Sequence, residues 1–256
     1  MSERDNGADT IRRAWGSVGV CLPVSFTSNP PADSLRAAVG RLDGAGYRAV
    51  WTNEVIGKDA MVQLAVLLSA SEHMVFGTCI ANIWARPAQT MHAAAAQLAQ
   101  AYPARFVLGL GVGYPEQAAS VGQEFGSPLA TMRDYVNRMD SPTWPPAPDA
   151  PYPRIIAANG PKMLALAGDI ADGALPAMLP PQFTERARQS LGPDKLLVVG
   201  LSLAPDGIEP PGIAADVRDH LTAGADHVTL LLPIGVDFAS GISQLERLAP
   251  ALAGLG

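Results

Sequence analysis

The sequence predicts an α/β fold of the (β/α)8 or TIM-barrel class, formed by a single domain over residues 15–256. Short apolar runs typical of strands alternate strictly with amphipathic or alanine-rich helical segments, eight such pairs follow one another, and the strand runs are apolar throughout. A helix between successive strands makes those strands parallel, and continuous apolar strands are buried on both faces. A doubly wound open sheet is the competing architecture, but eight units favour a closed barrel.

The first half of the chain contains four strand–helix pairs. Strands are predicted at residues 17–23, 49–54, 74–83 and 106–113. Apolar residues three or four positions apart indicate the helices, which are predicted around Leu35, Val39 and Leu42, around Met61, Leu64, Ala65 and Leu68, around Met91, Ala94, Ala95 and Leu98, and over 129–139.

The second half repeats the pattern after a proline-rich connector over residues 141–153. Strands are predicted at residues 154–160, 173–178, 196–204 and 227–233. Helices are predicted over 161–171, 184–191 and 214–224, and through Ile242, Leu245, Leu248 and Leu252. The connection after the seventh strand, residues 205–213, is short.

Composition and charge restrict the partners of the protein. The 256 residues are 48% hydrophobic, which is ample for a core, and the net charge is -6 without a basic run longer than two residues. A nucleic-acid partner is not expected, because phosphate backbones require a clustered positive surface. A membrane partner is not expected either, because no apolar run approaches the roughly 20 residues of a spanning helix.

The terminal segment and the cysteines indicate the compartment. Residues 1–14 are polar, lack an apolar signal core, and are predicted to be a flexible N-terminal tail. Cys21 and Cys79, the two cysteines, are far apart in apolar strand-like runs, so neither a disulfide nor a zinc site is expected. The four histidines share no metal-like spacing, and no metal site is predicted. These observations favour a cytoplasmic protein.

The stretch RFVLGLGVGYPE, residues 105–116, contains three alternating glycines, Gly109, Gly111 and Gly113. A dinucleotide-binding fingerprint would read GxGxxG at the first strand-to-helix turn. Here the spacing is GxGxG, the strand is the fourth, and no helix is predicted to begin at once. We therefore expect these glycines to let a flat ligand approach the strand ends of a barrel.

The segment AANGPK, residues 157–162, leaves the fifth strand and opens a helix. Backbone N–H groups at a helix start, together with the positive end of the helix dipole, form an anion site. Pro161 suits the first helical turn. An ordinary strand-to-helix turn is the alternative.

Four segments, GYRAVWTNE, GTCIANIWARP, YPARFVLGLGVG and ANGPKMLALAGDIADGAL, resemble the luciferase-like monooxygenase superfamily. More narrowly, they resemble its branch of F-420-dependent oxidoreductases, which use a deazaflavin. The resemblance implies a (β/α)8 barrel of the luciferase-like type, a homodimer, and a ring bound at the carboxyl ends of the strands. The family normally has a long excursion after the seventh strand, so the connection over 205–213 is a shortened one.

The resemblance also implies site residues. It implies a non-prolyl cis peptide at Cys79–Ile80 that backs the ring, and cofactor contacts at Cys79, Ile80, Ala81, Asn82, Gly111, Val112, Gly113, Ala158, Asn159, Gly160 and Glu54. Glu54 and Tyr114 are the catalytic candidates, and Trp84 and Arg86 are expected to line the substrate pocket. A solvated, helix-capping carboxylate is the alternative for Glu54. Structural packing and a helix-start arginine are the alternatives for Trp84 and Arg86.

The sequence therefore predicts an oxidoreductase that binds coenzyme F-420 and transfers hydride to or from a small organic substrate. One alternative is an FMN-dependent luciferase-like monooxygenase. The other is a degenerate, non-catalytic barrel that acts as a binding or scaffold protein, which the shortened connection favours. The apolar helices at residues 61–68 and 91–98 are consistent with a dimer surface or with core.

Overall fold

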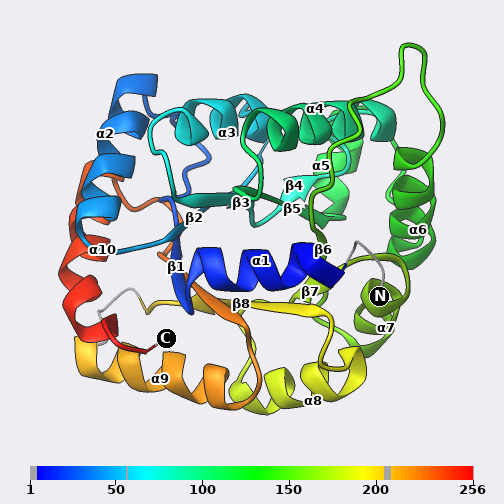
Figure 1. Ribbon diagram of the computed structural model, residues 1–256. Helices are drawn as coiled ribbons and strands as arrows, with labels where there is room; N and C mark the ends of the chain where they lie inside the picture. Colours follow the sequence, from blue (N-terminus) through cyan, green and yellow to red (C-terminus); the bar gives the residue numbers. More distant parts are fainter. Residues whose placement is uncertain (1–4, 56, 205–208, 256) are drawn as a thin grey trace.

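A computed structural model describes residues 5–55, 57–204 and 209–255. Within these residues all strand pairs are parallel, in the order β3-β2-β1-β9-β8-β7-β6-β5-β4, and β3 also pairs with β5, which closes the sheet. The strands are β1 (Val18–Cys21), β2 (Ala49–Thr52), β3 (Val75–Thr78), β4 (Ala81–Asn82), β5 (Phe106–Gly111), β6 (Arg154–Ala157), β7 (Gly173–Leu175), β8 (Leu196–Ser202) and β9 (His227–Leu231). Because β3 and β4 are two halves of one barrel strand, the predicted (β/α)8 class is confirmed (Figure 1).

Helices surround the barrel and bury its outer face. They are α1 (Asp5–Trp15), α2 (Ala32–Gly44), α3 (Ala60–Leu68), α4 (Ala88–Ala101), α5 (Pro115–Ser120), α6 (Pro128–Met139), α7 (Pro161–Ile170), α8 (Pro181–Leu191), α9 (Pro210–Thr222) and α10 (Phe238–Leu252). In the stripes through Leu64 of α3 and Met91 of α4, these two residues are fully buried in the core between barrel and helices. The other buried members are Met61, Leu68 and Ala95, and Ala65, Ala94 and Leu98 are partly buried. These stripes therefore belong mainly to the core, and homodimerisation stays a prediction from the sequence. None of the helices in the described ranges is long and apolar enough to cross a membrane.

Helix α1 replaces most of the predicted flexible tail. It lies across the amino end of the barrel (Figure 1), where Ile11 and Trp15 are 1% and 0% exposed. Arg12 fixes it there, because its Nη2 donates to the carbonyl oxygens of Pro193 and Lys195, each at 3.0 Å. The tail prediction is thus wrong for residues 5–14, whereas residues 1–4 lie outside the described part. Ile11 and Trp15 are the only large apolar residues in this segment, and two residues form too weak a stripe to predict a helix. The surface that buries them comes from strands distant in the sequence.

The amino end of the barrel interior is filled by aromatic rings. Trp15 packs against His227 and Trp51, with ring centroids 5.0 and 6.0 Å away. His227 Nε2 accepts a hydrogen bond from Trp51 Nε1 at 3.0 Å, and its Nδ1 bonds to the carbonyl oxygen of Gly16 at 2.7 Å. Burial lowers the pKa of His227 to about 4, so the ring is neutral and both of its nitrogens are used.

The third barrel strand is interrupted between β3 and β4. Phe76 and Gly77 pair with Phe106 and Val107, but Ala81 next pairs with Leu110, so one residue more lies on this strand than on β5. The Cys79–Ile80 peptide in this bulge is cis, as the resemblance predicted.

The side chain of Thr78 replaces the ladder bonds that the bulge removes. Its Oγ1 donates to the carbonyl oxygen of Gly109 at 2.7 Å and accepts from the Gly109 N–H at 2.8 Å. A Cβ on Gly109 would lie 2.0 Å from the carbonyl oxygen of Thr78. Gly109 is therefore required by the bulge itself.

Two details differ from the sequence prediction. Helix α5 begins at Pro115, directly after the glycine run, where no immediate helix was expected. The shortened connection is only partly visible, because residues 205–208 lie outside the described part; α9 nevertheless begins at Pro210, four residues earlier than predicted.

Candidate functional site

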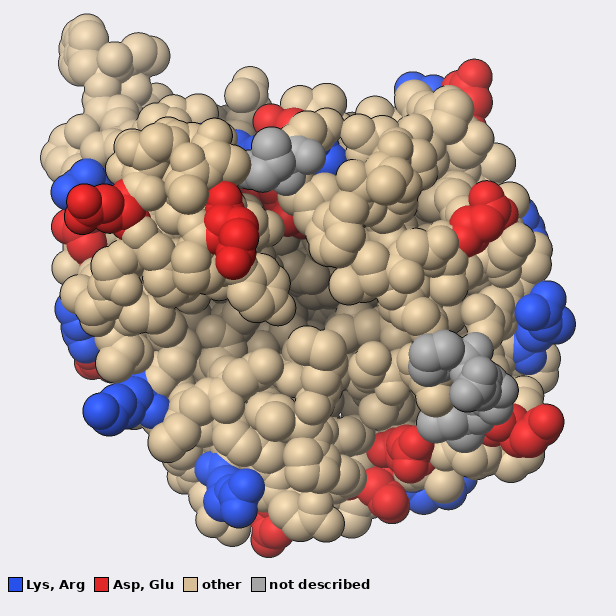
Figure 2. Space-filling view, turned by 180° about the vertical axis from the view of Figure 1, so that it is seen from behind, with Lys and Arg blue, Asp and Glu red and all other residues tan. Residues whose placement is uncertain are grey.

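The carboxyl end of the barrel is hollow where the amino end is filled. The inner core consists of the buried side chains inside the barrel, such as Trp15 and Trp51. The side chains that border it at this end are only partly buried: Val24, Cys79, Ile80, Ala177 and Leu231. Figure 2 shows this face from behind the view of Figure 1, with a central depression whose floor shows no charged side chain. Ligands of parallel barrels bind at this end, because the loops after the strands converge there.

A buried ion pair supports one wall of the hollow. Glu54, at the end of β2, is 3% exposed. Its Oε1 accepts from the Ala60 N–H and its Oε2 from the Asn82 N–H, each at 2.9 Å. Arg86 donates to both carboxylate oxygens, at 3.1 Å to Oε2, and also contacts Asp59 Oδ1 at 3.1 Å. The pair thereby joins the end of β2, the start of α3 and strand β4.

In this network Glu54 and Arg86 are each other's main charged partner. Burial lowers the pKa of Arg86, but the hydrogen bonds and charges of Glu54 and Asp59 raise it overall. Arg86 is therefore a permanent cation whose partner is a protein carboxylate, and its side chain is only 9% exposed. The arrangement favours a structural role for both residues over catalysis and substrate binding. Glu54 is nevertheless buried, so it is not the solvated capping carboxylate that was the alternative.

Asn82 carries an unused donor at the edge of the hollow. The residue is 1% exposed, and its Oδ1 accepts from the Trp84 N–H at 3.0 Å. Among the described residues, its Nδ2 has no hydrogen-bond partner. A buried amide without a partner costs free energy unless a ligand or water accepts from it.

Trp84 is half-buried and fixes the end of the glycine run. Its Nε1 donates to the carbonyl oxygen of Val112 at 2.7 Å, and its ring lies 6.1 Å from that of Phe125. Tyr114 is 67% exposed, and its backbone N–H is held by Gln117 Oε1 at 2.9 Å. The Tyr114 side chain therefore stays a candidate at the rim.

The glycines at the end of β5 and just after it have structural reasons to be glycine, apart from any ligand. A Cβ on Gly111 would lie 2.6 Å from Cγ1 of Ile80, so the Ile80 side chain occupies that space. Gly113 has a φ of +58°, which favours glycine. We predicted that a ligand approaches the backbone of residues 111–113. At Gly111 the side chain of Ile80 limits this approach. The side chains of Ala81 and Ala158 belong to the core between barrel and helices, so only their backbones can face a ligand.

The turn from β6 into α7 is open. Asn159 Oδ1 accepts from the Ala177 N–H at 2.9 Å, which orients the turn toward the loop after β7. Gly160 precedes the helix with a φ of -143°, and a Cβ there would meet nothing within 4 Å. Neither backbone conformation nor packing requires this glycine, and no side chain caps the helix. The first-turn N–H groups of α7 are available to an anion.

Lys58 and the two cysteines form a group that sequence reasoning missed. Cys79 Sγ lies 3.2 Å from Cys21 Sγ, and both thiols are free. Lys58 Nζ donates to Asn53 Oδ1 at 2.9 Å. Burial lowers the pKa of Lys58, while nearby Cys21, Cys79 and Glu54 act in the opposite direction. The hydrogen bond to Cys21 and burial raise the pKa of Cys79.

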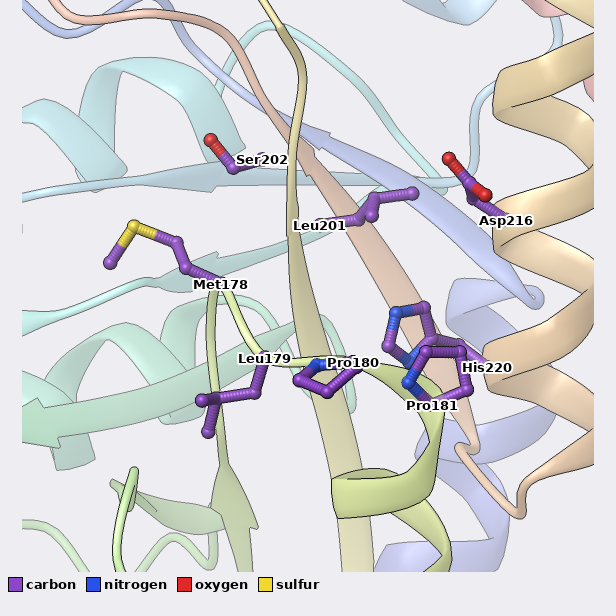
Figure 3. Close-up of a pocket in the computed structure, with 8 residues that line it drawn as sticks. All are labelled: Met178, Leu179, Pro180, Pro181, Leu201, Ser202, Asp216 and His220. Atoms are coloured by element: carbon purple, nitrogen blue, oxygen red, sulfur yellow. The ribbon is translucent and has the colours of Figure 1, made fainter.

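Two cavities flank the hollow. One of about 410 Å³ lies between the loops after β1 and β9, and Lys58, Gln63 and Asp237 are among its polar lining residues. The other, of about 270 Å³, lies between the ends of β7 and β8 and helix α9. Figure 3 shows Asp216 and His220, both from α9, among the residues that line this second cavity. Among the described residues, no group of three His, Cys, Asp or Glu side chains is arranged to hold a metal.

The sequence family follows from comparison with known proteins. The model of the luciferase-like monooxygenase family matches residues 17–192. The chain belongs to the luciferase-like monooxygenase family. The resemblance predicted from the four segments is therefore confirmed, and the matched region covers strands β1 to β7.

One of the similar proteins has a cofactor in its name. Rv3520c of Mycobacterium tuberculosis, named as a coenzyme F-420-dependent oxidoreductase, is 28% identical over 193 residues. The match covers 63% of this chain and 56% of that protein, so the chain spans little more than half of its curated relative.

Solved structures share the fold of this chain. An F-420-dependent secondary alcohol dehydrogenase with an F-420–acetone adduct has a TM-score of 0.74 at 17% identity, covering 92% of this chain and 98% of that one. The oxygenating component of 3,6-diketocamphane monooxygenase from Pseudomonas putida, in complex with FMN, has a TM-score of 0.59 at 13% identity, covering 73% and 66%.

Proposed function

We propose that the protein is an F-420-dependent oxidoreductase that transfers hydride to or from a small organic substrate. The observation that carries the proposal is the hollow at the carboxyl end of the barrel, whose floor in Figure 2 shows no charged side chain, with the unpaired Asn82 Nδ2 buried at its edge. Family membership and the name of the mycobacterial relative support the deazaflavin as the cofactor.

The residues around the hollow fit a flat heterocycle. Cys79 and Ile80 offer an apolar surface, and Asn82 Nδ2 offers a donor to a ring oxygen or nitrogen. A bound deazaflavin would supply the carbon that gives or accepts hydride. The protein's contribution is to hold the ring edge, exclude water from its face and place the substrate against it.

The helix start at Gly160 is the proposed site for the phosphate of the cofactor. Its position at the strand ends, its unused N–H groups and the empty space beside Gly160 support this assignment. Asn159 contributes by fixing the turn to Ala177. Val112 and Gly113 would line the path between ring and phosphate.

Glu54 and Arg86 are proposed to act as positioning residues. Through the Asn82 N–H, Glu54 holds the residue whose side chain faces the ring. Tyr114, which is exposed at the rim, is the remaining candidate to donate or accept a proton. Homodimerisation and a cytoplasmic location stay predictions from the sequence.

The test is a titration of the purified protein with F-420 and, separately, with FMN, following cofactor fluorescence and the thermal unfolding midpoint. Binding of F-420 in the micromolar range with weaker FMN binding would support the proposal. An Asn82→Leu variant should weaken binding of the preferred cofactor about tenfold, because it removes the donor.

FMN is the second candidate cofactor, favoured by the FMN-bound structure of the same fold. Tight FMN binding without F-420 binding would move the proposal to an FMN-dependent monooxygenase. Absence of binding by either cofactor would favour the non-catalytic barrel that the shortened connection suggests.

A further inference from the structure

Two thiols meet at the floor of the proposed ring site. Cys21 is the last residue of β1, and Cys79 follows the last residue of β3. Although 58 positions separate them, their sulfur atoms are 3.2 Å apart, about 1 Å more than a disulfide bond. Cys79 is partly exposed to the hollow, whereas Cys21 is 2% exposed beneath it.

We propose that Cys21 and Cys79 form a redox-active dithiol that low-molecular-weight disulfides oxidise to an intramolecular disulfide. The thiolate of Cys79 attacks a disulfide RSSR and releases one RSH, forming a mixed disulfide. Cys21 then attacks the Cys79 sulfur and releases the second RSH. In total, two thiols and one RSSR become one protein disulfide and two RSH, so atoms and electrons balance.

The surroundings determine which thiol reacts first and how fast. Cys79 is the more exposed residue of the two, so the mixed disulfide forms there. Lys58 is the charged group that acts on Cys79, and Glu54 in turn acts on Lys58. The bond to Cys21 and burial raise the pKa of Cys79, which slows exchange at neutral pH, while Lys58 acts against that shift.

Closing the disulfide would alter the proposed ring site, a consequence that depends on the proposed function. Cys79 lies in the bulge between β3 and β4. Its backbone N–H donates to the carbonyl oxygen of Thr52 at 2.8 Å, so drawing its sulfur toward Cys21 pulls on this hydrogen-bonded segment. Ile80 moves with it, and Ile80 forms the floor above Gly111. We expect oxidation to weaken cofactor binding about tenfold, equivalent to about 1.4 kcal/mol.

The experiment treats the reduced full-length protein with oxidised glutathione at mildly alkaline pH and measures its intact mass. Because the chain has two cysteines, an intramolecular disulfide can only be Cys21–Cys79. The wild type should lose two hydrogen atoms, and dithiothreitol should restore them. The Cys21→Ser variant should stop at a glutathione adduct on Cys79, and Cys79→Ser should react most slowly.

Other outcomes overturn the inference. Glutathione adducts on the wild type without ring closure, or no reaction while the urea-unfolded protein reacts, would show that the pair does not form a disulfide. Oxidised protein that binds F-420 and FMN as tightly as reduced protein would refute the effect on the site. If the reduced protein bound neither cofactor, the proposed function would fail, but the mass measurement would still decide whether the disulfide forms.

Discussion

The two ends of the barrel are built from the same strands but in opposite ways. At the amino end, Trp15, Trp51 and His227 fill the interior, and α1 covers them. At the carboxyl end, the inward side chains of Cys79 and Ala177 stay partly exposed around a depression.

The difference separates residues that hold the fold from residues that are free for a ligand. A side chain at the filled end touches protein on all sides, so changing it should alter stability without altering binding. At the hollow end, a Cβ added to Gly160 would meet nothing within 4 Å beyond its chain neighbours. The Glu54–Arg86 pair is the exception, because it lies at the hollow end yet is buried like core.

Trp15→Ala tests the filled end and should show one of the two largest effects. Removing a fully buried tryptophan leaves a cavity and is expected to lower the free energy of unfolding by about 3–5 kcal/mol. Urea unfolding measures it, and cofactor affinity should not change. The control is Trp144→Ala, at a residue that is 97% exposed, with an expected effect below about 0.5 kcal/mol. A large loss of cofactor affinity in Trp15→Ala would contradict the separation of the two ends.

Arg86→Met tests the exception at the hollow end. It leaves the buried Glu54 carboxylate without its cation, so the free energy of unfolding should fall by about 3–5 kcal/mol. The control is Arg133→Met, which breaks a pair whose partners are 50% and 61% exposed and should cost about 0–1 kcal/mol. Equal effects of the two substitutions would show that the Glu54 network does not support the wall.

Acidification tests the filled end through His227. Its pKa is about 4 in the folded protein against an ordinary value of 6.5 in an unfolded chain, so between these values the unfolded chain binds more protons. Stability from this group is complete above pH 6.5 and should fall by about 3 kcal/mol as the pH drops to 4. Urea unfolding across this range measures it. His227→Gln should be less stable at neutral pH but have a shallower pH dependence, and an unchanged slope would exclude His227 as its source.

Two glycines give the smallest effects on stability and the clearest contrast. Gly109→Ala should cost about 1–3 kcal/mol, because its Cβ would collide with the backbone of Thr78. Gly160→Asp should leave stability unchanged or slightly raised, because aspartate is a good helix cap. It should nevertheless weaken cofactor binding about tenfold by repelling the phosphate. Thermal unfolding and the F-420 titration measure the two effects, and undiminished affinity in Gly160→Asp would place the phosphate elsewhere.

The order of strands and helices could be predicted from the sequence, because it depends on local patterns. Apolar runs mark the strands, and stripes such as the one through Leu64 mark the helices. Helix α1 could not be recognised in this way. Its stripe consists of Ile11 and Trp15, and only the assembled amino end of the barrel gives them a surface to bury.

The sequence named residues that the structure places at the carboxyl end of the barrel, but it did not predict their partners. Glu54 and Arg86 were each identified, yet their pairing joins residues 32 positions apart and depends on the bulge after β3. The thiol contact spans 58 positions and contradicts the distance suggested by the sequence. Lys58 was missed. The sequence signal that could have found it is the helix start at Asp59, because Lys58 directly precedes this capping residue in the loop after β2.

The distribution of the tryptophans makes each part of the molecule observable by its own emission. Trp15 and Trp51 are enclosed at the filled end, and Trp144 is in solvent on the connector. Trp84 alone stands at the rim of the hollow, bonded to Val112. A ring bound there would quench or accept the excitation of Trp84 first, so wild-type protein can report ligand arrival without an attached dye.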